Sequence, residues 1–165
     1  MLKKTIFFFS VLFLIGPISL STASDFVISD YTFTWHVAKA GYVTMKVQKQ
    51  KDSLLIILSS RGGKLATLAL SPAQAEAVAD VLSKTDDYYK KHKESRDMKS
   101  MDTVPVGEYK VSFSSEQGEN FEVRVEEAKL FTACVLLNRN DALTIAEYLK
   151  KSKEMAEFVD NRIRP

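Results

Sequence analysis

Two stretches of the chain, 67 residues apart, share one pattern of apolar and polar positions. Residues 64–70 and 131–137 each have apolar residues at every second position, as on one face of a β-strand: Ala66, Leu68 and Leu70 in the first, and Ala133, Val135 and Leu137 in the second. Each is followed by a stripe of apolar residues at helical spacings of three and four. An internal repeat of a strand and a helix indicates two copies of one structural unit. The stripes are Ala75, Val78, Ala79 and Leu82 in the first copy, and Ala142, Ile145, Ala146 and Leu149 in the second.

Both predicted helices have residues suited to their N-termini. Ser71 can accept a hydrogen bond from a free N–H of the first turn, Pro72 fits the first helical position, and Gln74 can complete a capping box. Asn138 can cap the second helix, and Asp141 places a carboxylate near its positive end. We predict helices over residues 72–94 and 140–162, with a linker at 95–102.

Three further runs typical of strands precede each strand-helix unit, and most of them alternate, whereas residues 54–58 are continuously apolar. The runs lie at 33–37, 43–47 and 54–58 in the first half, and at 104–106, 109–113 and 121–125 in the second. Pro105 limits the 104–106 run to a short edge strand, because proline donates no hydrogen bond. When the apolar faces of the two repeats are aligned, equivalent residues lie 66 positions apart before residues 114–120 and 67 positions apart after them. The second repeat is therefore predicted to contain one extra residue at 114–120. The predicted fold class is α+β, with two tandem β-β-β-β-α repeats whose antiparallel sheets are each backed by a C-terminal helix.

The first 24 residues have the pattern of a cleaved secretory signal. Lys3 and Lys4 precede an apolar run at residues 6–15, and small residues precede a predicted cleavage after Ala23. The run is short for a membrane span, and no later stretch approaches one. We therefore expect an exported protein, periplasmic or secreted, without an integral membrane segment after cleavage. The repeats are predicted over residues 25–99 and 100–165, within one compact domain.

Charge is balanced overall and uneven between the halves. The chain has 23 basic and 21 acidic residues, so loss of Lys3 and Lys4 would leave a net charge of about zero. Residues 25–99 contain 12 basic and 9 acidic residues, and residues 100–165 contain 9 and 12. The halves carry opposite charges and could attract each other within a chain or between chains.

One strand is apolar on both of its faces. Leu55 and Ile57 occupy the face turned away from the predicted core, where the second repeat has Glu122 and Arg124. A strand that is apolar on both faces is usually covered on both. The cover is either the other repeat or a second protein chain, so Leu55 and Ile57 form a candidate interaction surface.

The stretch from residue 63 to 82, with its Ser71-Pro72-Ala73-Gln74 turn, resembles the last strand and helix opening of the PC4-like single-stranded-DNA-binding coactivators. The tandem β-β-β-β-α plan is similar to that of the Whirly and Pur-alpha families. These resemblances imply that basic and aromatic residues on a sheet contact a nucleic-acid strand. Their counterparts here are Tyr42, Lys46, Lys49, Lys51, Arg61 and Lys64.

Motifs for catalysis or metal binding are not found in the sequence. Cys134 is the only cysteine, so no internal disulfide can form, and neither His36 nor His92 is placed beside it by a motif. Two histidines without companion cysteines do not make a zinc motif. The adjacent acids at 86–87 and 126–127, and the basic run that includes Lys90, Lys91, Lys93 and Arg96, are typical of solvated surfaces.

The sequence therefore predicts an exported, non-catalytic binding or assembly module that acts through a sheet face, with a second copy or another protein as partner. No cofactor or metal is expected. Two alternatives stay open: a single-stranded nucleic-acid-binding protein, and a small exported enzyme in which a thiol at Cys134 is the first candidate.

Overall fold

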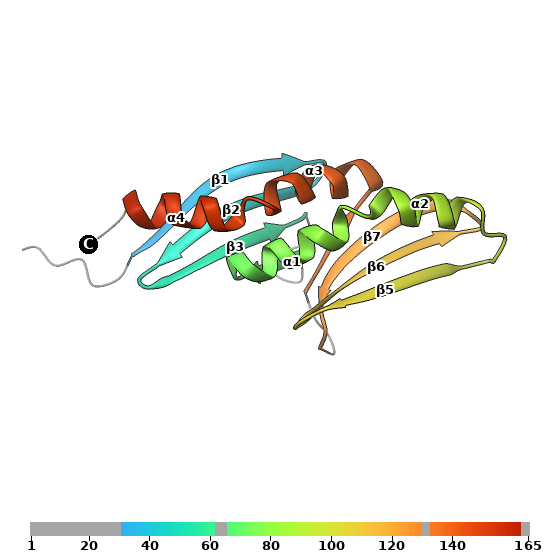
Figure 1. Ribbon diagram of the computed structural model, residues 1–165, viewed down its shortest axis with the longest axis horizontal. Helices are drawn as coiled ribbons and strands as arrows, with labels where there is room; N and C mark the ends of the chain where they lie inside the picture. The colour runs from blue at the N-terminus through green and yellow to red at the C-terminus, as the bar shows by residue number, and fades with distance from the viewer. Residues whose placement is uncertain (1–30, 62–65, 130–132, 163–165) are drawn as a thin grey trace, which may run out of the picture.

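Two four-stranded antiparallel sheets and the helices that follow them make up the structure (Figure 1). The computed structural model describes residues 31–61, 66–129 and 133–162. Within them, the predicted α+β fold of two tandem β-β-β-β-α repeats is confirmed. Sheet 1 contains, in spatial order, β1 (Thr32–Ala40), β2 (Val43–Gln50), β3 (Ser53–Ser59) and β4 (Thr67–Leu70), followed by α1 (Pro72–Leu82) and α2 (Thr85–Lys93). Sheet 2 contains β5 (Ser100–Val106), β6 (Tyr109–Glu116), β7 (Glu119–Glu127) and β8 (Cys134–Leu137), followed by α3 (Arg139–Leu149) and α4 (Ser152–Arg162).

The predicted helix starts are confirmed. The Ser71 side chain accepts a hydrogen bond from the Gln74 backbone N–H, and the Gln74 side chain accepts one from the Ser71 N–H, which completes the capping box. Asn138 accepts a hydrogen bond from the Asp141 N–H at 2.8 Å. All eight residues of the two apolar stripes are buried.

The prediction of one continuous helix in each repeat is wrong. Each helical region divides into two at equivalent positions, after Leu82 and after Leu149, which lie 67 residues apart. Thr85 follows the first break, and its hydroxyl donates to the Leu82 carbonyl at 2.5 Å. A side-chain hydroxyl that bonds to the backbone in this way competes with continuation of the helix.

The second helix of each repeat lies on the sheet of the other repeat. Helix α2 packs on β6 and β7 of sheet 2, and α4 packs on β2 and β3 of sheet 1, while α1 and α3 pack against each other at the centre (Figure 1). The buried residues of both sheets and the helices form one hydrophobic cluster. The two repeats are thereby interlocked.

The extra residue predicted near residues 114–120 is confirmed. The pairing of β6 with β7 shifts register between Ser114 and Glu116, because β7 holds one more residue there than β6. The corresponding pairing of β2 with β3 is regular from Thr44 to Gln50. The shift keeps the apolar faces of both sheets toward the helices.

The predicted linker at 95–102 is too long. Strand β5 begins at Ser100 and continues through Pro105, at the edge of sheet 2. Proline is tolerated there because an edge strand has one side without a strand neighbour.

The two sheets approach each other through their last strands. Strand β4 contacts β8, and the Tyr109 hydroxyl of β6 donates to the Ala69 carbonyl of β4 at 2.7 Å. Burial, together with the nearby Glu127 and Glu108, raises the pKa of Tyr109 above its usual value of 10.0. The bond joins sheet 2 to the last strand of sheet 1.

Candidate functional site

The surface of sheet 1 that faces away from the helices contains the two residues predicted for interaction. We call it the outer face of sheet 1, and its centre is formed by His36, Lys46, Gln48, Leu55, Ile57 and Ala69, which lie opposite one another on the four strands. Leu55 and Ile57 are half-buried and do not belong to the hydrophobic core cluster. Helix α4 of the second repeat lies on the opposite face, where Val159 joins the core. In the described part of the chain, helix α4 of the other repeat therefore covers the helix side of sheet 1, and not the face that carries Leu55 and Ile57.

A basic and aromatic region continues this face at one end of the sheet. The Arg61 guanidinium lies 5.4 Å from the centre of the Tyr42 ring, and Tyr42 is 71% exposed. Tyr42, Arg61 and Lys39 line a hollow of about 260 Å³ together with Thr44 and Ser59, whose hydroxyls lie 2.8 Å apart. No described strand position on the outer face of sheet 1 is Asp or Glu. The face thus combines apolar side chains, Leu55 and Ile57, with cations at its centre and at its end.

The structure brings together only some of the predicted anion contacts. Lys46 lies at the centre of the outer face beside Ile57, and Tyr42 and Arg61 lie at its end. The structure corrects the prediction that Lys49 contacts an anion on this face. By strand alternation its side chain points to the helix side, where it is 5% exposed and pairs with Asp160 of α4 at 2.5 Å. Lys51 lies in the β2–β3 turn with a positive φ of 52°. Lys64 lies outside the described residues.

The outer face of sheet 2 has the opposite character. By strand alternation it presents Glu116, Glu119, Glu122 and Glu126 beside the cations Lys110 and Arg124, and Lys99 lines a hollow there with two of the glutamates. Lys110 pairs with Glu126 at 3.2 Å, and Arg124 pairs with Glu122 at 3.4 Å. Leu136 and Met101, 43% and 64% exposed, add apolar surface to the same face. The two outer faces are complementary in charge and share apolar patches.

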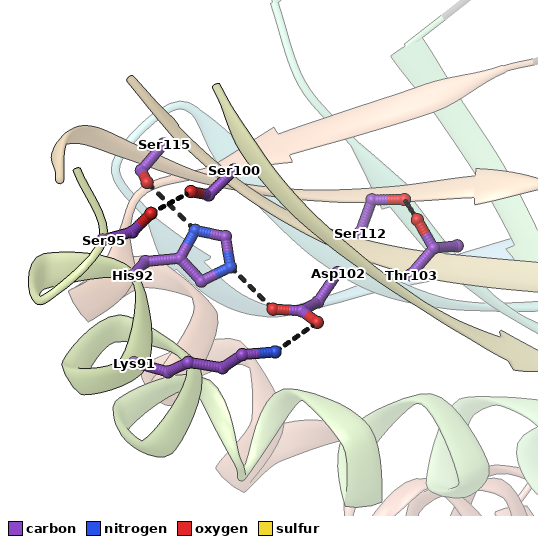
Figure 2. A network of polar contacts seen from close by, with 8 residues as sticks. All are labelled: Lys91, His92, Ser95, Ser100, Asp102, Thr103, Ser112 and Ser115. Carbon is purple, nitrogen blue, oxygen red and sulfur yellow. Dashed lines mark hydrogen bonds and ion pairs between the residues drawn. The ribbon is translucent and has the colours of Figure 1, made fainter. Parts of the chain in front are cut away.

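A polar network that the sequence analysis missed joins α2 to sheet 2 (Figure 2). The His92 ring lies between the Ser115 hydroxyl, 3.0 Å from Nδ1, and the Asp102 carboxylate, 2.9 Å from Nε2. The other Asp102 oxygen accepts from Lys91 Nζ at 2.6 Å. The Lys91 hydrogen bond lowers the pKa of Asp102 below its usual 3.8, burial opposes this, and the His92 contact reinforces it. Lys91 and His92 are adjacent in sequence, while Asp102 and Ser115 come from two later strands, so no sequence motif identified the network.

The network contains serine, histidine and aspartate, but its geometry does not suit nucleophilic catalysis. Ser115 and His92 are 2% and 1% exposed, so a substrate cannot reach the hydroxyl without rearrangement of α2. The T-shaped contact of the His92 ring with Phe121, at 5.5 Å, closes the site further. The arrangement fixes a helix of the first repeat to the sheet of the second.

The remaining candidates for chemistry are separated in space. Cys134 is half-buried on the outer face of sheet 2, opposite Glu126, rather than in the core. His36 lies on β1 of the other sheet and His92 lies in its own network, so the structure does not pair either ring with the thiol. Within residues 31–61, 66–129 and 133–162, no group of three or more His, Cys, Asp or Glu side chains could hold a metal ion. None of the described helices is long and apolar enough to span a membrane.

Asp86 and Glu126, each from a pair of adjacent acids, have structural partners. Asp86 accepts from Arg139 at 2.7 Å, which joins α2 to α3. The Arg139 hydrogen bond lowers the pKa of Asp86 below 3.8. Glu126 pairs across the strands with Lys110, so these carboxylates have roles in packing.

The chain matches no protein-family model, and a comparison with curated proteins gives no match. The resemblance to PC4-like, Whirly and Pur-alpha proteins stays a prediction.

Proposed function

We propose that this protein is an exported, non-catalytic assembly module in which the outer face of sheet 1 docks on the outer face of sheet 2 of a second copy. The observation that carries the proposal is the complementarity of these faces. One is apolar and basic without an acidic strand position, and the other presents four glutamates beside exposed Leu136 and Met101.

The energetics favour a contact with both apolar and ionic parts. Leu55 and Ile57 are partly exposed, so covering them would contribute on the order of 1 kcal/mol each. Exposed ion pairs contribute little individually, about 0 to 1 kcal/mol, but they select the partner face and fix its orientation. The assembly should therefore weaken as salt rises.

A charge reversal on each face tests the proposal. Lys46→Glu should lower the mass in solution at low salt, because it puts a carboxylate at the centre of the basic face. Adding Glu122→Lys to the same chain should restore part of the mass. Lys90→Glu is the matched control, because Lys90 is exposed on α2 and lies on neither outer face.

Leu55→Glu tests the apolar part of the contact. We expect it to weaken association at least about tenfold while the protein stays folded, because the side chain is outside the core cluster. Circular dichroism and light scattering would be compared with the parent chain. An unchanged mass for both Lys46→Glu and Leu55→Glu contradicts the proposal, and so does unfolding of Leu55→Glu, which would make Leu55 a core residue.

Export is part of the same proposal and is supported by the pattern of residues 1–24, which lie outside the described residues. Cleavage after Ala23 predicts that the protein recovered from its producing cells begins at Ser24. An N-terminal sequence that still begins at Met1 would remove export from the proposal.

Single-stranded nucleic-acid binding is a second candidate, favoured by the exposed Tyr42 ring with Arg61 over it and Lys39 and Lys46 nearby. A base could stack on Tyr42 while these cations meet phosphates. A fluorescent oligothymidylate should then bind at low salt, release at high salt, and bind more weakly to Tyr42→Ala. Absence of binding at low salt would eliminate this candidate.

A further inference from the structure

The four outer edges of the two sheets differ in how they are protected. Strands β4 and β8 lie against each other, and the Tyr109 hydroxyl bonds to the Ala69 carbonyl of β4. Strand β5 contains Pro105, which cannot donate to an added strand, and its Asp102 is held by Lys91 and His92. Within the described residues, β1 has a strand neighbour on one side only.

The first half of β1 lacks the features that usually block an open edge. Residues 32–36 read Thr-Phe-Thr-Trp-His, with no proline and no permanently charged side chain. Their pairing with β2 is regular, and the register shift comes afterwards, between His36 and Ala38. A regular, uncharged edge rich in threonine and aromatic residues is a template for pairing with another strand.

An aromatic row and a hollow lie on the helix side of this edge. The Tyr31, Phe33 and Trp35 rings follow one another at centroid distances of 5.2 and 5.9 Å, and Phe33 is 40% exposed. Helix α4 packs on α1 and, within sheet 1, on β2 and β3, and a hollow of about 360 Å³ lies between it and β1. Its apolar lining includes Trp35, Val37, Met155, Phe158 and Val159.

We propose that the first half of β1 pairs with the same segment of a second copy, antiparallel and centred on Thr34. This register is the one that pairs the whole regular run, residues 32–36, with itself. It sets Thr34 opposite Thr34 of the second copy, and Thr32 opposite His36 of the second copy. It also sets Phe33 opposite Trp35 of the second copy, so that Phe33 lies beside the second copy's hollow, which Trp35 lines.

The segment is therefore complementary to itself in both its backbone and its side chains. The open N–H and C=O groups of β1 gain partners, and the exposed Phe33 ring is covered by the aromatic row of the other chain. Two copies of sheet 1 become one eight-stranded sheet with a continuous outer face. The pairing does not depend on the docking of outer faces, and because it uses backbone bonds and aromatic contact it persists at high salt.

Cysteine cross-linking tests the register in a Cys134→Ser background, which removes the only native thiol. The side chains of Thr32, Thr34 and His36 are all exposed on the same face of β1, so cysteines there are equally accessible. In the proposed register, a cysteine at position 34 lies opposite the cysteine at position 34 of the second copy. Their Cα atoms would be about 4.5 to 5.5 Å apart, which is within disulfide range. Cysteines at position 32 of both copies would lie on the order of 13 Å apart, beyond that range.

We expect Thr34→Cys to form a covalent dimer under mild oxidation at least about tenfold faster than Thr32→Cys or His36→Cys alone, because pairing raises the effective concentration of the thiols. An equal mixture of Thr32→Cys and His36→Cys should give the heterodimer at a rate close to that of Thr34→Cys. Circular dichroism checks that each variant is folded. Equal rates for the three single variants, or no heterodimer from the mixture, overturns the proposal even if the docking of outer faces is correct.

Discussion

At the scale of single residues, the helix break in each repeat is followed by a buried hydroxyl, and the two hydroxyls differ in their hydrogen bonding. Thr85 and Ser152 follow the breaks 67 residues apart, and both are 0% exposed. The Thr85 hydroxyl donates to Leu82, whereas the Ser152 hydroxyl has no hydrogen-bond partner in the described residues. A buried hydroxyl stabilises a fold only when it is bonded.

This difference gives a matched pair of substitutions. Thr85→Val keeps the shape and removes a bonded hydroxyl, so it should lower the free energy of unfolding by about 1 kcal/mol. Ser152→Ala removes an unbonded one and should leave that free energy unchanged or raise it by up to about 1 kcal/mol. Urea unfolding of the two variants measures both effects, and a larger loss for Ser152→Ala than for Thr85→Val would contradict this description of the break.

The Asp102 carboxylate gives a prediction about pH. Its pKa is lowered in the folded protein by Lys91 and His92, so it stabilises the fold above its unfolded pKa near 3.8, and this contribution is lost as pH falls through the lower folded value. Asp102→Asn should cost about 1 to 2 kcal/mol at neutral pH. The difference from the parent chain should shrink below pH 3.8 in urea unfolding curves. A difference that stays constant down to pH 2 would show that the charge of Asp102 does not contribute.

At the scale of elements, the helix caps, the apolar stripes and the register shift could all be predicted, because each depends on residues close together in sequence. The division of the helices could not, since Ser83, Lys84, Lys150 and Lys151 are all acceptable within a helix. The start of β5 was also missed, because Ser100 to Asp102 become a strand only through pairing with β6.

Helix α1 depends on its cap. Ser71→Ala removes the side-chain acceptor for the Gln74 N–H and should lower the free energy of unfolding by about 1 kcal/mol. Ser53→Ala, at an exposed position next to a turn, is the control and should change it by less than about 0.5 kcal/mol. Equal effects of the two substitutions in urea unfolding would argue against a role for the capping box.

At the scale of the whole molecule, the candidate surface could be predicted only in part. Leu55 and Ile57 were identified because alternation alone places them away from the helices. The burial of Lys49 was missed, because it results from α4 of the other repeat crossing onto sheet 1 and placing Asp160 beside it. The His92 network and the hollow beside β1 depend on the same exchange of helices, which no local pattern encodes.

The crossing of helices also bears on how the molecule assembles. Because helices cover the inner faces of both sheets, the outer faces and the edge of β1 are the sheet surfaces left for a partner in the described residues. Docking of outer faces depends on charge, whereas pairing of β1 does not.

The most direct test is the mass in solution of the chain that begins at Ser24, by light scattering at low salt and in about 1 M salt, where charges are screened beyond roughly 3 Å. We predict a dimer at high salt, held by β1, and a larger assembly at low salt, held also by the outer faces. A mass that does not change with salt would contradict docking of the outer faces, and a monomer in both conditions would contradict self-assembly altogether.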